Sequence, residues 1–187
     1  MIIQNYIKVK IINFEFKAIA NDLQKLEEKL MEINPTFKGE DHQIDTYFNV
    51  TKGRLKLREG KIENALIYYE RQDLPAAKQS NILLYKHLPE KSLKDILTKL
   101  HGIKVVVEKK RKIYFISNVK FHFDIVKELG TFIEVEAIDE TGEIGIQKLK
   151  EQCNKFIFFG LDQSNYINAS YSDLLLEKQV KQNGGSR

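Results

Sequence analysis

The segment GTFIEVEA, residues 130–137, is the most informative stretch of this chain for its fold. β-Branched and aromatic residues are frequent in it, which favours a β-strand over a loop. Glu134 and Glu136 alternate with Ile133 and Val135, and side chains two residues apart on a strand point to the same face. Two carboxylates side by side repel each other by roughly a few tenths of a kcal/mol or more. We therefore expect cationic groups opposite them.

The whole chain has the composition of an ordinary globular domain. It has 187 residues, of which 42% are hydrophobic and 30% charged, and a formal net charge of +4. This small positive charge is compatible with an anionic ligand but too small to indicate nucleic acid. The single cysteine, Cys153, excludes an internal disulfide and a multi-cysteine zinc site and favours a reducing compartment, so we expect a cytoplasmic protein.

No membrane segment or secretion signal is expected. The apolar runs are shorter than a bilayer-spanning helix requires. The first residues, MIIQNYIKVK, lack the basic region, apolar core and cleavage site of a signal peptide in their usual order.

Periodicity predicts an antiparallel meander of strands interrupted by amphipathic helices. Asn21 is the predicted N-cap of the first helix, Ser92 that of the second, and Gly102 ends the second. The predicted strands are 12–18, 43–50, 53–60, 64–71, 81–88, 103–116, 119–126 and 130–137, and the predicted helices are 21–35, 92–102, 145–160 and 168–178.

Most predicted strands are apolar on one face and ionic on the other. An antiparallel sheet with one face in water has this pattern, so a solvated ionic face is one interpretation. The amphipathic helices favour another, because their apolar stripes need a surface to cover and the ionic face would then point inward. The ionic faces carry Asn13, Glu15, Lys17, Arg54, Lys56, Arg58, Lys109, Arg111, Lys120, His122, Asp124, Glu134 and Glu136.

The two signs of charge are separated along the chain. Carboxylates occur on the first strand and the last two, whereas basic residues concentrate on the strands between. A surface selected only for solubility would mix the signs. Carboxylates suit Mg²⁺ or Mn²⁺, and lysine and arginine neutralise phosphate oxygens. If the sheet closes, the pattern predicts a tunnel that binds a polyanion together with a divalent cation.

At this point the residues resemble a known family, the CYTH superfamily, named for class IV adenylyl cyclases and thiamine triphosphatases. The signature of this family is an ExExK strand, which residues 13–17 resemble with Asn13 in place of the first glutamate. Each match is weak alone, but they occur in the family order. The further matching segments are KLR at 56–58, VEKKR at 107–111, FHFD at 121–124, LGTFIEVEA at 129–137 and SYSDLLLE at 170–177.

The resemblance implies an α+β fold in which an antiparallel eight-stranded β-barrel, the triphosphate tunnel, is flanked by helices. It implies a single domain over residues 12–178, with residues 1–11 as an N-terminal extension. It also suggests a homodimer and Mg²⁺ or Mn²⁺ as the cofactor. The sequence of the remaining residues, 179–187, predicts a disordered tail.

The resemblance also implies roles for individual residues. Lys17 and Asp124 would be catalytic, and Asp124 would act as a further metal ligand or as a proton acceptor. Asn13 would remove one negative charge from a metal site, although its amide can still offer an oxygen. The implied metal ligands are Glu15, Glu134, Glu136 and Asp124, and the implied phosphate ligands are Lys17, Lys56, Arg58, Arg71, Lys86, Lys109 and Arg111.

Three functions remain open from the sequence. The first is class IV adenylyl cyclase activity, which converts ATP to cyclic AMP and pyrophosphate. The second is hydrolysis of the terminal phosphate of inorganic triphosphate, thiamine triphosphate or a nucleotide. The third is a non-catalytic module that binds polyphosphate or nucleotide, which Asn13 favours. An RNA-binding sheet is disfavoured, because most aromatic residues share the apolar face.

Overall fold

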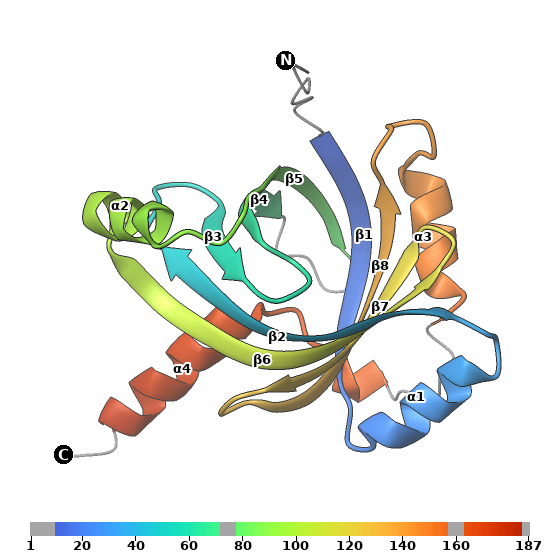
Figure 1. The fold of residues 1–187 in the computed structure, drawn as a ribbon. Coiled ribbons are helices and arrows are strands. Elements are labelled where there is room, and N and C mark those ends of the chain that lie inside the picture. Colours follow the sequence, from blue (N-terminus) through green and yellow to red (C-terminus); the bar gives the residue numbers. More distant parts are fainter. Residues whose placement is uncertain (1–9, 72–77, 157–162, 185–187) are drawn as a thin grey trace.

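The computed structural model describes residues 10–71, 78–156 and 163–184. Eight antiparallel strands close into a barrel in the order β1-β5-β4-β3-β2-β6-β7-β8 (Figure 1). The α+β class and the eight-stranded antiparallel barrel are therefore confirmed. The strands are β1 (Lys10–Ile19), β2 (Thr36–Phe48), β3 (Arg54–Glu59), β4 (Ala65–Arg71), β5 (Lys78–Lys86), β6 (Ile103–Ile116), β7 (Val119–Val126) and β8 (Gly130–Asp139).

The helices lie outside the barrel (Figure 1). They are α1 (Leu23–Met31), α2 (Lys91–His101), α3 (Ile146–Asn154), the short 3-10 helix η1 (Gln163–Asn165) and α4 (Tyr171–Gly184). Helix α3 contacts β1 and β8, and α4 contacts β6. None of the helices in the described part of the chain combines the length and the apolar character that crossing a bilayer requires.

The main hydrophobic core lies between the barrel and the helices. The outward side chains of β1, β7 and β8 pack there against Leu26 and Leu30 of α1 and against Leu149 and Cys153 of α3. The predicted outward orientation of the apolar faces is confirmed, and Cys153 is a fully buried thiol as expected. The strand residues of this core include Phe14, Phe16, Phe121, Phe123, Ile133 and Val135.

Two smaller clusters cover further parts of the barrel wall. Leu175 of α4 belongs to a cluster with Val107 and Phe132. Leu97 of α2 packs with Phe48 and Leu57. Because apolar side chains leave the barrel on these sides, the alternate positions of the same strands point into its interior.

Several element boundaries differ from the prediction. Strand β2 begins at Thr36, where its main chain starts to pair with β6, rather than at residue 43. The side chains of its first residues are mostly exposed and show no apolar alternation, so the sequence pattern did not reveal this part of the strand. The N-cap of α1 is Asp22, whose carboxylate accepts a hydrogen bond from the Lys25 amide, rather than Asn21. Helix α2 begins at Lys91 without a side-chain cap, so the predicted Ser92 cap is wrong.

The last helix is longer than expected. Helix α4 continues to Gly184, so residues 179–184 are helical where the sequence predicts a disordered tail. Residues 1–9 and 185–187 lie outside the described residues.

Candidate functional site

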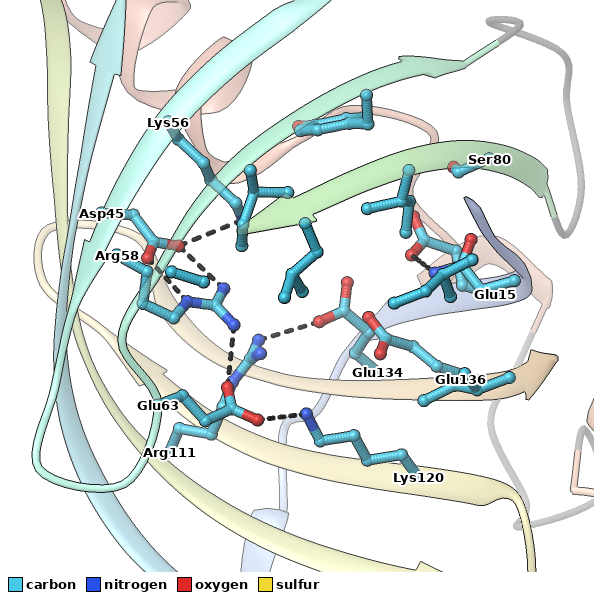
Figure 2. Close-up of a pocket in the computed structure, with 18 of the residues that line it drawn as sticks. Glu15, Asp45, Lys56, Arg58, Glu63, Ser80, Arg111, Lys120, Glu134 and Glu136 are labelled. Atoms are coloured by element: carbon cyan, nitrogen blue, oxygen red, sulfur yellow. Dashed lines mark hydrogen bonds and ion pairs between the residues drawn. The ribbon is translucent and has the colours of Figure 1, made fainter. Parts of the chain in front are cut away.

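The barrel encloses a cavity of about 650 Å³. Alternate residues of β1, namely Asn13, Glu15 and Lys17, line it. Inward residues of other strands, among them Arg58, Arg111 and Glu134, line it as well (Figure 2). The interpretation of the ionic face as an inward face is therefore confirmed. The predicted site residues that line the cavity are Glu15, Lys17, Lys56, Arg58, Lys86, Lys109, Arg111, Glu134 and Glu136.

The acidic side of the cavity is formed by β1 and β8. Antiparallel pairing places Glu15 opposite Glu136 and Lys17 opposite Glu134. Glu134 accepts from Lys17 Nζ at 3.0 Å and from an Arg111 guanidinium nitrogen at 2.8 Å. Burial acts to raise the pKa of Glu134, but Lys17, His122 and Arg111 hold it well below its usual range. The cations expected opposite Glu134 are thus present.

Glu136 has different charged neighbours from Glu134. In register it lies between Glu15 on β1 and Lys120 on β7. Burial and the neighbouring charge of Glu134 raise its pKa to about 7, in spite of the attraction of Lys120. Glu136 is therefore a buried carboxyl group beside a second carboxylate, in contrast to Glu134, which two cations contact.

A set of three side chains on this side can hold a metal ion. Each of His122, Glu134 and Glu136 offers one ligand atom, and these three atoms lie within 4.8 Å of one another. His122 is buried, and burial together with Arg111 and Lys120 lowers its pKa to about 3, which keeps the ring neutral as a metal ligand requires. Its Nδ1 lies 3.1 Å from Glu134, and its Nε2 has no hydrogen-bond partner among the described residues. These residues fit a small divalent cation.

Asp124, for which the resemblance implies a catalytic and metal-binding role, is not among the residues that line the cavity. Its carboxylate accepts from Arg111 Nε at 2.7 Å and from a second Arg111 nitrogen at 2.6 Å. The Tyr171 hydroxyl donates to it at 2.7 Å, and Asp124 is 0% exposed. Because both oxygens are engaged behind Arg111, this geometry favours orientation of the arginine over direct metal ligation.

The basic side of the cavity contains a carboxylate that the sequence interpretation missed. Asp45 on β2 accepts from Arg58 at 2.8 and 3.0 Å, from Lys109 at 2.7 Å and from Lys56 at 3.3 Å (Figure 2). Burial opposes its ionisation, but these cations hold its pKa well below the usual value. The expected separation of charges by sign is therefore incomplete. Alternation of Gln43, Asp45 and Tyr47 is the signal that places Asp45 on the inward face.

Lys109 is the least stably charged of these bases. It is 2% exposed, and burial with the nearby charges of Arg58 and Arg111 lowers its pKa to about 7, although Asp45 acts to raise it. A bound anion would favour its charged form.

A second missed carboxylate, Glu63, comes from the loop between β3 and β4. It accepts from Arg58 at 2.9 Å and from Lys120 at 2.5 Å (Figure 2). The Asp41 carboxylate holds the loop by accepting from the backbone amides of residues 61, 62 and 63. A Cβ at Gly60 would lie 2.6 Å from Asp41, so this approach requires glycine. A loop has no periodic pattern that would have revealed Glu63.

Four further basic or aromatic residues were singled out from the sequence. Lys86 is exposed and contributes to the cavity lining. Arg71 ends β4 opposite Ser80, and its side chain lies outside the described residues. Arg54 pairs with Asp173 of α4 at 2.9 Å. Tyr171, which belongs to the matching segment at 170–177, lies under Lys17, whose Nζ is 4.0 Å from its ring centroid.

Comparisons with solved structures show the same fold in other proteins. The PH1012 protein of Pyrococcus horikoshii matches with a TM-score of 0.72 and 22% identity, over 87% of this chain and 98% of that one. A conserved hypothetical protein of Pyrococcus furiosus matches with a TM-score of 0.72 and 22% identity, over 87% of this chain and 99% of that one. A candidate adenylate cyclase of Vibrio parahaemolyticus matches with a TM-score of 0.70 and 16% identity, over 87% of this chain and 97% of that one. At these identities the likeness concerns the fold.

The fold and site define a triphosphate tunnel protein. The family model of the CYTH domain matches residues 12–171, which is most of the chain. The chain therefore belongs to the CYTH domain family, and the resemblance seen in its motifs is confirmed. A search of curated proteins found no match.

Proposed function

We propose that this protein is a divalent-metal-dependent enzyme that acts on a triphosphate inside the barrel. The observation that carries this proposal is the placement of Glu134 and Glu136 in one closed cavity with the cations of β3, β6 and β7 (Figure 2). Burial and the charge of Glu134 raise the pKa of Glu136 to about 7, and positive charge placed between the two carboxylates would relieve their repulsion. A divalent cation would supply it.

The metal would be held by carboxylates of β1 and β8. Glu15, Glu134 and Glu136 are the proposed ligands, and His122 is a further one that lies within reach of the last two. When bound, Mg²⁺ or Mn²⁺ would neutralise phosphate oxygens and increase the electrophilicity of phosphorus. Asp124 is proposed to orient Arg111 instead of binding the metal.

The phosphates would be held by the basic residues that line the cavity. Asp45 and Glu63 now accept hydrogen bonds from several of these side chains, and phosphate oxygens would compete for the same donors. Arg71 remains a predicted ligand from the sequence. The proposed phosphate ligands are Lys17, Lys56, Arg58, Lys86, Lys109 and Arg111, with Lys120 as an addition from the structure.

The reaction that we propose is cyclisation of ATP, as in class IV adenylyl cyclases. The ribose 3′-oxygen would bond to the α-phosphorus, the bond to the bridging oxygen would break, and pyrophosphate would leave. The hydroxyl proton would pass to a base or to solvent. The alternative is attack of water on the terminal phosphorus, which needs the same positioning and charge stabilisation.

A product-resolved assay tests the proposal. ATP, inorganic triphosphate and thiamine triphosphate are each incubated with Mg²⁺ or Mn²⁺, and the products are separated. Cyclic AMP with pyrophosphate supports the cyclase, and orthophosphate supports the triphosphatase. Tight binding without any product would support the non-catalytic module instead. The homodimer and the cytoplasmic location stay predictions from the sequence.

A further inference from the structure

The lining of the cavity changes from ionic to apolar along β1 and β8. On β1 the inward residues run from Lys17 and Glu15 through Asn13 to Ile11. On β8 Glu136 is followed at the next inward position by Ile138, which pairs in register with Asn13. The carboxylates thus border an apolar region of the same cavity.

Strands β4 and β5 continue this apolar region. Ile67 on β4 lies opposite Leu84 on β5, and Ile82 on β5 lies opposite Ile11 on β1. All of these side chains line the cavity. We call Ile11, Ile67, Ile82, Leu84 and Ile138 the apolar wall.

The apolar wall offers nothing to a phosphate chain. Hydrated phosphate oxygens gain no favourable contact from aliphatic carbon, whereas an apolar ligand that removes this surface from water is stabilised in proportion to the area it covers. The cavity of about 650 Å³ lies within the range of roughly 300 to 1,000 Å³ that is usual for sites of organic ligands. The wall therefore indicates a ligand with an organic part.

Asn13 places an unsatisfied acceptor at the border of the apolar wall. Its side chain is 3% exposed, and its Nδ2 donates to Glu15 at 3.4 Å. Its Oδ1 has no hydrogen-bond partner among the described residues. A buried polar atom without a partner is costly and uncommon, so a ligand donor is a physical explanation for it. Ser80, which faces Asn13 in register across β1 and β5, adds a hydroxyl to the same border (Figure 2).

We propose that the apolar wall, with Asn13 and Ser80, is a subsite for the organic part of the substrate. This inference rests on the proposed triphosphate site and narrows its substrate class to organic triphosphates. The apolar body of the ligand covers the isoleucine and leucine side chains, and one of its N–H or O–H groups donates to Asn13 Oδ1. Inorganic triphosphate, which has no such body, is then a weaker ligand than an organic triphosphate.

The first test compares two ligands on the unmodified protein. Calorimetry in Mg²⁺ measures the binding of inorganic tripolyphosphate and of ATP in which a methylene group replaces the α,β-bridging oxygen, so that cyclisation cannot occur. We expect the nucleotide to bind at least about tenfold more tightly. Equal or tighter binding of tripolyphosphate overturns the subsite alone. If neither ligand binds, the proposed function fails as well, so the two failures are distinguishable.

The second test uses two neighbouring leucines of β5. Leu84 lines the cavity, whereas Leu83 is 39% exposed and is absent from the cavity lining. We expect Leu84→Ala to weaken binding of the nucleotide about fivefold or more and to change that of tripolyphosphate by less than about twofold. The control Leu83→Ala should leave both affinities unchanged. An equal loss for both ligands in Leu84→Ala would overturn the subsite.

The third test removes the unsatisfied acceptor. Asn13→Leu is close in size and leaves no polar atom at this position. We expect nucleotide affinity to fall about three- to tenfold relative to that of tripolyphosphate, while the melting temperature of the ligand-free protein stays equal or rises. Unchanged nucleotide affinity would show that Oδ1 contacts no part of the ligand and would overturn the role of Asn13.

Discussion

Two clusters of charged side chains share the cavity, and they are balanced in opposite ways. Around Asp45, one carboxylate meets the cations of Lys56, Arg58 and Lys109. Around Glu136, the nearby groups include the further carboxylates of Glu134 and Glu15. In the first cluster several cations surround one carboxylate, whereas in the second carboxylates lie beside one another. Asp45 holds bases in place, whereas the role that we propose for Glu136 is to bind a cation.

The directions of the pKa shifts express this difference. The pKa of Asp45 is held well below its usual value, although burial opposes this, because its cations outweigh the cost of desolvation. The pKa of Glu136 is raised to about 7, because burial and Glu134 act together. Both residues are carboxylic acids in one cavity, so the charges of their neighbours decide in which direction the pKa shifts.

The largest expected effect is on activity, from Glu136→Gln. The substitution removes a proposed metal ligand, so turnover should fall on the order of 100-fold or more and Mn²⁺ binding by calorimetry should weaken. Stability of the metal-free protein should stay the same or rise, because the change removes a charge that Glu134 repels. Glu140→Gln, at an exposed carboxylate of the same cavity, is the matched control. Unchanged turnover in Glu136→Gln would argue against the metal assignment.

The next effect is on stability, from Asp45→Asn. Removal of this carboxylate leaves buried cations without their partner, so the free energy of unfolding should fall by about 3 kcal/mol in urea titrations. Tripolyphosphate should restore part of the loss by neutralising the same cations.

The control for this change is Asp95→Asn. Asp95 forms an exposed ion pair with Lys91 at 4.0 Å, and its removal should cost less than about 0.5 kcal/mol. If Asp45→Asn were as stable as this control, the buried cations around Asp45 would not depend on its carboxylate for their stability.

The smallest expected effect is on the pH dependence of tripolyphosphate binding, and it comes from the titration of Lys109. Its pKa is lowered from 10.5 in the unfolded chain to about 7, so the unfolded state binds more protons between these values. Lys109 should therefore make the ligand-free protein more stable as pH rises through this window. Binding of tripolyphosphate should weaken several-fold over the same rise, because Lys109 loses its charge.

Lys109→Arg supplies the reference for this pH series, since arginine stays protonated throughout. The ratio of the affinities of the two proteins removes the titration of tripolyphosphate itself. A ratio that does not change with pH would show that Lys109 keeps its charge in the cavity and would contradict the lowered pKa.

The parts of the site that could be predicted are those with a strand period. Alternation placed Glu15, Glu134 and Glu136 on one face, and the structure confirms that this face points inward. Asp124 shares the alternation but lies behind Arg111, because register and neighbouring side chains decide how far an inward residue reaches. Glu63 belongs to a loop, where no period exists to assign a face.

The alternating pattern of this chain predicted the antiparallel strands and the outer apolar core and favoured an inward ionic face, because a strand side chain has only two directions and the helices must cover the apolar one. The eight-stranded barrel was implied by the resemblance of its motifs to the CYTH superfamily. Closure of the sheet then determined which strands face each other across the cavity. It placed Asp45 among bases and left Glu136 among acids, and it brought Ile11 beside Ile82. Charge balance depends on distances between residues far apart in the chain, which local periodicity does not contain.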